Sequence, residues 1–228
     1  MTTLARYDEF ADWYVDFASA WDVGPLALAP DGLAGQRVLD LACGHGQLSR
    51  HLARLGAQVT GVDISTALLG RAAGLDRTEP LGIRYLTGDV CHTSWWDGAV
   101  FDGVVCHMAL MDIDDLEGAL RTARAVVAPT GWFSFSLFHP CYPGGWDGSP
   151  TGLPSWPPGG YAQQARWTTN GDGVRGRVGA NHRMLSTYLN AVLRAGFEFE
   201  VFYEPPLPLP IHLAARCRPA RSRATAGS

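Results

Sequence analysis

Along this chain, short and almost fully apolar runs alternate with longer stretches in which apolar residues recur every three or four positions. Runs of the first kind predict buried parallel strands, and the second pattern predicts helices packed on one side. Strands are expected at Val38–Leu41, Gln58–Val62, Ile83–Leu86, Phe101–Cys106 and Trp132–Phe138, and helices over 46–55, 65–73 and 116–127. The alternation predicts an α/β fold, a doubly wound and mostly parallel sheet covered by helices on both faces.

The beginning of the chain carries aromatic residues at the same helical spacing. They are Tyr7, Phe10, Trp13, Tyr14 and Phe17. The spacing predicts a helix over residues 7–21 with one aromatic face. Two interpretations of this face remain open: the rings pack as an ordinary part of the core, or they close over a cationic or planar ligand.

After the fifth expected strand the alternation stops. Residues 139–181 are rich in glycine, proline and aromatic residues, and an irregular segment of this length is typical of a lid or a binding loop. We expect a substrate lid, because disordered linkers are poor in aromatic residues. Residues 166–168 and 174–178 are expected to pair as a hairpin within it. The aromatic residues expected to contact a planar or apolar metabolite are Trp146, Trp156, Tyr161 and Trp167.

A helix and two strands are expected to complete the chain. The helix starts at His182 and ends before Gly196, and the strands cover residues 197–203 and 211–217. Residues 218–228 are small and Arg-bearing, and we expect a flexible tail there.

Composition limits the classes of function. The chain has 228 residues, 46% of them hydrophobic, which is enough to bury one full core. A formal net charge of −4 argues against a nucleic-acid partner, because phosphate contacts need clustered Lys and Arg. All 18 basic residues are Arg, so chemistry that needs a lysine is excluded. The five cysteines show no C-x-x-C spacing, and we expect reduced thiols and no metal site.

The N-terminus lacks the apolar core of a signal peptide, and no run approaches the roughly 18 apolar residues that span a bilayer. We therefore expect a cytoplasmic protein with no membrane partner. A monomer and a homodimer are both compatible with the sequence.

Three acidic residues follow three successive strands. They are Asp40, Asp63 and Asp89, and ligands of doubly wound sheets bind at this edge. Asp63 comes about 20 residues after the glycine turn at Gly44 and Gly46, where a carboxylate can accept both hydroxyls of a ribose. The alternative for Asp63 is a helix cap. Asp89 is placed to accept from an amino group such as that of adenine, and its alternative is an ordinary turn.

A dinucleotide fingerprint needs a third Gly or Ala in G-x-G-x-x-G, and Ser49 occupies that position. The sequence instead resembles the class I S-adenosylmethionine-dependent methyltransferases, in particular the small single-domain kind that modify metabolites. The segments that carry the resemblance are Asp40–Gly46, Asp63–Ser65, Gly88–Val90, Phe101–Met108 and Leu120–Trp132.

The resemblance implies a Rossmann-like, seven-stranded and mostly parallel sheet whose last strand is antiparallel and lies at the edge. It also implies S-adenosylmethionine as the cofactor. The implied contacts are Ala42, Cys43, Gly44 and Gly46 for the methionine part, Asp40 for its amino group, Asp63 for the ribose, Ile64, Asp89 and Val90 for the adenine, His107 and Met108 beside the sulfonium, and Tyr7 and Tyr14 as a closing wall.

Transfer of a methyl group needs an acceptor atom aligned with the C–S bond, and a hydroxyl acceptor must lose its proton. Histidine suits that task because its pKa lies near neutrality. His139, directly after the fifth strand, is the first candidate base, and His182 at the end of the lid is the second. The alternative for each is an imidazole hydrogen-bonded to a loop carbonyl. The resemblance adds Arg183 as a lid anchor or substrate contact.

The sequence therefore predicts a single-domain enzyme, residues 1–228, that methylates O or N of a small aromatic or hydrophobic metabolite, by analogy in specialised metabolism. An alternative is a protein that holds the cofactor as a structural ligand and catalyses another reaction, such as a cyclisation. The expected parts are an N-terminal helical cap (1–35), a cofactor-binding core (36–138), a substrate lid (139–181), a C-terminal helix with strands (182–217) and the tail (218–228).

Overall fold

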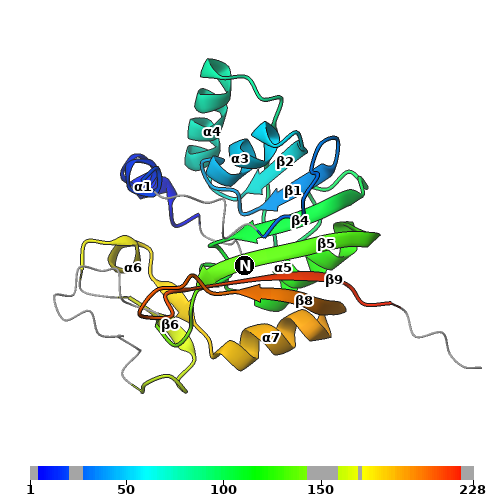
Figure 1. Ribbon diagram of the computed structural model, residues 1–228. Coiled ribbons are helices and arrows are strands. Elements are labelled where there is room, and N and C mark those ends of the chain that lie inside the picture. Colours follow the sequence, from blue (N-terminus) through cyan, green and yellow to red (C-terminus); the bar gives the residue numbers. More distant parts are fainter. Residues whose placement is uncertain (1–4, 21–27, 143–158, 169–170, 222–228) are drawn as a thin grey trace, which may run out of the picture.

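The structure, a computed structural model, describes residues 5–20, 28–142, 159–168 and 171–221. The central sheet contains β1 (Arg37–Leu41), β2 (Gln58–Asp63), β3 (Arg84–Thr87), β4 (Phe101–His107), β5 (Val127–Phe138), β8 (Phe197–Tyr203) and β9 (His212–Pro219). Its order is β3-β2-β1-β4-β5-β9-β8 (Figure 1). Strands β1 to β5 pair in parallel, and β9 is antiparallel to both of its neighbours. The predicted fold class is therefore confirmed.

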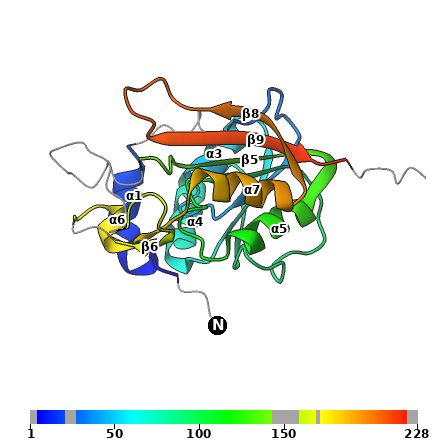
Figure 2. The same ribbon diagram turned by 90° about the horizontal axis from the view of Figure 1, so that it is seen from below.

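Helices pack on both faces of this sheet. They include α3 (Gln47–Arg54), α4 (Thr66–Thr78), α5 (Leu116–Val126) and α7 (Leu185–Arg194). Leu48 and Leu52 of α3 share one core cluster with Val38. Leu39, the next residue of β1, belongs to the second cluster, which includes buried residues of α5 and α7. Successive residues of β1 thus enter opposite cores, which explains why the strand is apolar throughout. Figure 2 shows α5 and α7 side by side on one face.

The prediction that the last strand lies at the sheet edge is wrong. β9 lies between β5 and β8, and β8 forms the edge. The reason is burial: Ala214 and Ala215 of β9 are fully covered, whereas Val201 and Phe202 of β8 are 37% and 49% exposed. Small side chains buried on both faces fit the interior of a sheet, and a strand with exposed side chains fits its edge.

The hairpin predicted within the segment after β5 is present, but its second strand lies later in the chain than predicted. β6 (Ala165–Trp167) pairs antiparallel with β7 (Ala180–His182), and the residues predicted as its partner form the short helix α6 (Val174–Arg177). Gly179 adopts a φ of 67°, which a residue with a side chain rarely takes, and the chain passes through it from α6 into β7. Helix α7 consequently begins at Leu185, later than predicted.

The leading segment forms a short 3₁₀ helix, η1 (Asp8–Phe10), followed by α1 (Ala11–Ala18), in place of one helix over 7–21. It lies at the same end of the sheet as α6 (Figures 1 and 2). The guanidinium of Arg177 in α6 lies 4.5 Å from the ring centroid of Trp13 in α1. Among the residues that the structure describes, no helix is long and apolar enough to cross a membrane.

Candidate active site

The glycine turn after β1 and the acid after β2 are joined by hydrogen bonds. One carboxylate oxygen of Asp63 accepts from the backbone N–H of Gly44 at 2.7 Å, and the other accepts from the N–H of Ser65 at 2.8 Å. The helix cap itself is made by Ser65, whose hydroxyl accepts from the N–H of Leu68 at 3.1 Å. Asp63 is therefore not the side chain that caps α4. It lies instead against the glycine turn, where its carboxylate can also accept from a ligand hydroxyl.

The backbone of the turn is shaped for close approach. Ala42, Gly44 and Gly46 have positive φ values of 58°, 56° and 80°. A Cβ added at Gly46 would lie only 2.4 Å from the hydroxyl oxygen of Tyr85, so there is no room for a side chain at that position. The glycine turn leads directly into the start of α3, where the first N–H groups of a helix attract polar ligands. It fits the amino-acid end of S-adenosylmethionine.

Asp40 lies beneath the turn and is almost completely buried. Its carboxylate accepts a hydrogen bond of 2.6 Å from the hydroxyl of Ser49, the residue that replaces the third glycine of a dinucleotide fingerprint. Burial raises the pKa of Asp40 to about 7, although the Ser49 bond opposes the shift. A nearby cation would favour the ionised carboxylate, which is what an ammonium group of a ligand supplies.

The residues expected around an adenine also lie at this edge. The N–H of Gly88 donates to the carbonyl of Asp63 at 2.9 Å, which joins the ends of β2 and β3. Asp89 accepts from the N–H of Cys91 at 2.9 Å, so it forms the turn that was its alternative interpretation. Ile64 is partly buried and Val90 is buried.

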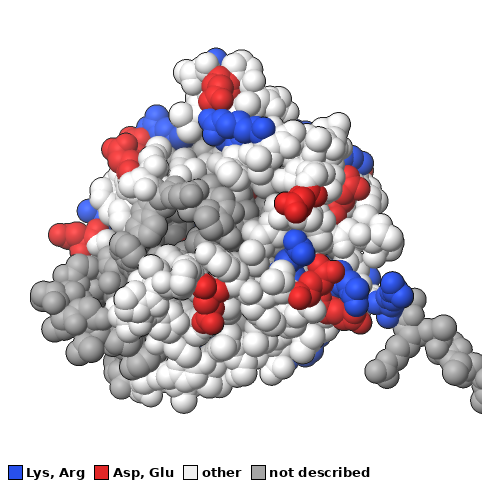
Figure 3. Space-filling view, in the orientation of Figure 1, with Lys and Arg blue, Asp and Glu red and all other residues white. Residues whose placement is uncertain are grey.

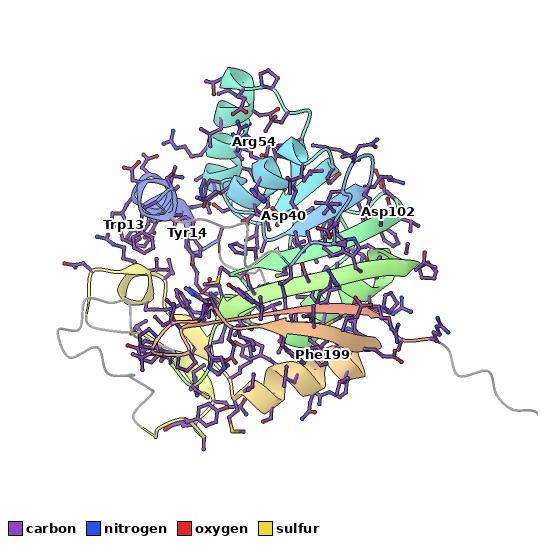
Figure 4. The ribbon with its side chains drawn as sticks, in the orientation of Figure 1. Trp13, Tyr14, Asp40, Arg54, Asp102 and Phe199 are labelled. Atoms are coloured by element: carbon purple, nitrogen blue, oxygen red, sulfur yellow. The ribbon has the colours of Figure 1, made fainter. Side chains whose placement is uncertain are left out.

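The leading segment reaches the glycine turn through its aromatic rings. Tyr7 and Tyr14 make an edge-on contact with ring centroids 4.7 Å apart, and Tyr14 contacts His45 of the turn at 5.9 Å. Figure 4 shows Tyr14 beyond the end of β1 that carries Asp40. Asp8 adds a 2.5 Å hydrogen bond from the hydroxyl of Ser65. The segment is thus attached to the loops after both β1 and β2.

The residues after β4 are held by β5. The backbone N–H of Met108 donates to the carbonyl of Ser136 at 2.9 Å, and Met108 has a positive φ of 52°. The Nδ1 atom of His107 lies 2.8 Å from the Ser136 hydroxyl. Burial lowers the pKa of His107 to about 4, so its imidazole is neutral at physiological pH.

A shallow pocket that is open to solvent, with a cavity volume of about 20 Å³, lies next to these elements. Its walls come from the loops after β4 and β5, from β6 and β7, and from α6 and α7. Its lining residues include Met111, Phe138, Trp167, Arg175, His182 and Arg183. Three of these, Trp167, His182 and Arg183, are predicted site residues, and the structure brings them together. Tyr161 lies behind them, and its hydroxyl accepts from the N–H of Leu185 at 2.8 Å.

The two candidate bases differ in their surroundings. The buried His182 has Nε2 2.8 Å from the carbonyl oxygen of Tyr161, which can only accept, so Nε2 carries the proton and Nδ1 is the acceptor. Both nitrogens of His139 are engaged, Nδ1 by the N–H of Cys141 at 3.1 Å and Nε2 by Glu204 at 3.2 Å. Burial lowers the pKa of His139 despite Glu204. The pocket lining includes Pro140 but, among the described residues, not His139.

Sequence reasoning missed a buried ion pair beside the pocket. Arg175 of α6 donates to Asp112 of the loop after β4 at 2.7 Å, and Tyr7 donates to the other oxygen of Asp112 at 3.0 Å. The only signal in the sequence is an acid shortly after a strand and an Arg in the glycine-rich segment. These residues are far apart in the chain, so their pairing needs the fold. Two predicted substrate contacts, Trp146 and Trp156, lie outside the described residues.

Comparison with known proteins finds methyltransferases. Residues 39–135 match the family model described as a methyltransferase domain. The ubiquinone biosynthesis O-methyltransferase of Paracidovorax citrulli is 36% identical over 146 residues, which are 60% of this chain and 61% of that protein. An S-adenosylmethionine-dependent methyltransferase from Mesorhizobium loti has a similar structure, with a TM-score of 0.69 and 29% identity over 90% of this chain and 99% of that one.

The chain is similar to the class I S-adenosylmethionine-dependent methyltransferases, the resemblance that its motifs indicated, and residues 39–135 match a methyltransferase domain. The matched residues include the glycine turn, Asp63 and Asp89. The cofactor of the family is S-adenosylmethionine, which fits the glycine turn described above. The chain spans about three fifths of the length of the curated relatives that it matches.

Proposed function

We propose that this chain transfers a methyl group from S-adenosylmethionine to a small aromatic or hydrophobic metabolite, at an oxygen or a nitrogen atom. The observation that carries the proposal is the contact of Asp63 with the N–H of Gly44, which places the acid of β2 at the glycine turn of β1. A ribose and an adjoining amino-acid group need these two features together. When bound, the cofactor supplies an electrophilic methyl group.

This chain's residues then have distinct tasks. Asp63 holds the ribose hydroxyls, and the backbone around Gly44 and Gly46 holds the carboxylate of the methionine part. Asp40 balances its ammonium group. Ala42, Cys43, Ile64, Asp89, Val90, His107 and Met108 complete the walls, and Tyr7 and Tyr14 exclude water from above, which strengthens the polar contacts below.

His182 is the general base in this proposal, in preference to His139. The carbonyl of Tyr161 fixes the His182 tautomer, so that Nδ1 is the atom available to take a proton. Within the described part of the chain, Nδ1 has no hydrogen-bond partner, whereas both nitrogens of His139 have one. Trp167 and Phe138 line the same pocket and offer flat apolar contacts to a ring.

The relatives named as O-methyltransferases favour an oxygen acceptor. Their names refer to ubiquinone biosynthesis, and a setting in specialised metabolism stays a prediction for this chain. A small-molecule acceptor is also supported by the surface. On the face shown in Figure 3, acidic and basic side chains of the described residues are interspersed and form no basic stripe for a nucleic acid.

The second candidate function is a cyclisation without methyl transfer, which the fold also allows. The [4+2]-cyclase SpnF shares the fold, with a TM-score of 0.57 at 22% identity over 86% of this chain. Identity at this level concerns the fold alone.

The experiment incubates the protein with methyl-labelled S-adenosylmethionine and a panel of phenols, aromatic amines and aromatic acids. We expect labelled product and an equal amount of S-adenosylhomocysteine. Product without consumption of the cofactor would support the cyclisation. In single turnovers, we expect His182→Gln to slow the transfer about 100-fold or more, and His139→Gln to slow it only a few-fold. The opposite ranking would reject His182 as the base.

A further inference from the structure

The pocket that holds the methyl acceptor in the proposed function is lined by cationic side chains and, among the described residues, by no acidic ones. Two guanidinium groups line it, those of Arg175 and Arg183, and none of the described lining side chains is a carboxylate. The rest of the wall is mostly apolar, with Phe138 and Trp167 among its members. A cavity with cationic groups and low-dielectric walls attracts anions.

Arg175 is buried and fixed in place by hydrogen bonds that involve only one of its three side-chain nitrogen atoms in the described part of the chain. It is 93% buried, since its exposed fraction is 7%. Its Nη1 atom donates to a carboxylate oxygen of Asp112 at 2.7 Å and to the carbonyl of Gly179 at 3.1 Å. Its guanidinium carbon lies 5.1 Å from the ring centroid of Phe138. Within the described residues, its Nε and Nη2 atoms donate no hydrogen bond, although Arg175 lines the pocket.

Those two nitrogens form one side of the planar guanidinium fork. Nε and Nη2 together match the spacing of two carboxylate oxygens, and such bidentate pairs are among the strongest hydrogen bonds in proteins. Anchoring through Nη1 removes much of the entropy cost of presenting the other two donors. Asp112 offsets part of the charge of Arg175, but it is bound at Nη1, also accepts from Tyr7 at 3.0 Å, and leaves Nε and Nη2 able to donate.

Arg183 adds positive charge without an acidic partner. Its guanidinium donates to the carbonyl oxygens of Leu110, Ile113 and Asp114 at 2.8 to 3.1 Å. In the part of the chain that the structure describes, it forms no ion pair with a carboxylate. Carbonyl groups orient the cation but leave its net charge, so Arg183 contributes a positive charge to the pocket.

We infer that the methyl acceptor is an aromatic or planar molecule that carries a carboxylate, and that Nε and Nη2 of Arg175 bind this carboxylate while the ring lies against Phe138 and Trp167. Arg175 is then a specificity-determining residue: it selects acids over their neutral analogues. This inference rests on the proposed function and narrows its substrate class.

The test measures binding of matched acid and amide pairs to protein saturated with S-adenosylhomocysteine, which prevents turnover. The probes are 4-hydroxybenzoate, 4-hydroxycinnamate and indole-3-acetate, each with its primary amide, and binding is measured by calorimetry. In the wild type, we expect at least one acid to bind about tenfold or more tightly than its amide. In Arg175→Gln, the preference should fall to twofold or less.

Arg177→Gln is the matched control, because Arg177 belongs to the same short helix but is exposed and stacks on α1. It should keep the preference for the acid. Arg175→Gln leaves Asp112 without its cation, so the double variant Asp112→Asn with Arg175→Gln, which keeps the local charge balance, is measured beside it. The double variant should also lose the preference.

Two results would overturn the inference. One is a wild type that binds acids and amides equally or binds none of them, and the other is an acid preference that survives in both Arg175 variants. Binding of S-adenosylhomocysteine in the same samples separates this failure from that of the proposed function. If that ligand binds with no acid preference, only the Arg175 inference fails; if it does not bind, the proposed cofactor site fails.

Discussion

Replacing Asp40 by asparagine would remove a buried titratable group from beneath the glycine turn with almost no change of shape. Asp40 is 1% exposed, and burial raises its pKa from 3.8 to about 7. In the proposed complex, the ammonium group of the cofactor lies near this carboxylate and favours its ionised form. Cofactor affinity should therefore depend on pH through Asp40.

The magnitude follows from the fraction of Asp40 that is ionised in the free protein. With a pKa of about 7, that fraction is about 0.9 at pH 8 and about 0.1 at pH 6. A ligand that requires the ionised carboxylate should bind about tenfold more weakly at pH 6 than at pH 8, a difference of about 1.4 kcal/mol.

The same shift affects folding with a definite sign. Between about pH 4 and pH 7 the folded protein holds a proton on Asp40 that the unfolded chain has released. The free energy of unfolding should therefore fall as pH rises through this window, by up to about 4 kcal/mol, and then level off. Asp40→Asn should lack this component.

The assay is calorimetry of S-adenosylhomocysteine at pH 6, 7 and 8. Methylthioadenosine, which lacks the amino-acid group, is the control ligand and should show no dependence on Asp40. In Asp40→Asn the affinity for S-adenosylhomocysteine should be flat across this range. A wild type whose affinity changes less than twofold between pH 6 and pH 8, or a variant that keeps the full pH dependence, would refute the reasoning.

Three further predictions concern the turn, the core and the leading segment. Gly46→Ala should lower the free energy of unfolding by about 1–3 kcal/mol in urea titrations, because its φ is 80° and the new Cβ meets Tyr85; an unchanged midpoint would contradict this. Phe133→Ala, at a fully buried position, should lower the free energy of unfolding by about 3–5 kcal/mol. The folded fraction should bind S-adenosylhomocysteine with an affinity within a few-fold of the wild type, and a large loss of that affinity would contradict a purely structural role for Phe133. Asp8→Ala removes the partner of the Ser65 hydroxyl and should cost about 1 kcal/mol or less in stability, yet weaken cofactor binding measured by calorimetry a few-fold; equal affinity would show that the segment does not close the site.

Most of the sheet could be predicted from the sequence, because buried parallel strands are apolar on both faces. The position of β9 could not, since neither Ala214 nor Phe202 reveals from local pattern which strand is covered. For a similar reason, only the first strand of the hairpin expected in the segment after β5 was predicted correctly. Residues 174–177 form a short helix in which Arg175 bonds Asp112, a contact between distant parts of the chain that a local pattern does not encode.

Some contacts of the candidate site could likewise be predicted from the sequence, and others could not. Glycines and acids that follow neighbouring parallel strands lie at the same edge of the sheet, so the contact of Asp63 with Gly44 could be predicted. The surroundings of the histidines were not predictable, because the partners of His139 and His182 come from Glu204 and the carbonyl of Tyr161. Loop contacts of this kind depend on how the chain returns to the sheet, which periodicity does not encode.

Calorimetry of S-adenosylmethionine with wild-type protein and with Asp63→Ala tests most directly whether the glycine turn and Asp63 hold the cofactor. Asp97→Ala, which alters an exposed acid paired with Arg84, serves as the control. We predict one-to-one binding in the wild type and the control, and affinity at least about tenfold weaker in Asp63→Ala, as expected for lost hydrogen bonds to a charged group. No binding in the wild type, or wild-type affinity in Asp63→Ala, would contradict the assignment of the glycine turn and Asp63 as the cofactor site.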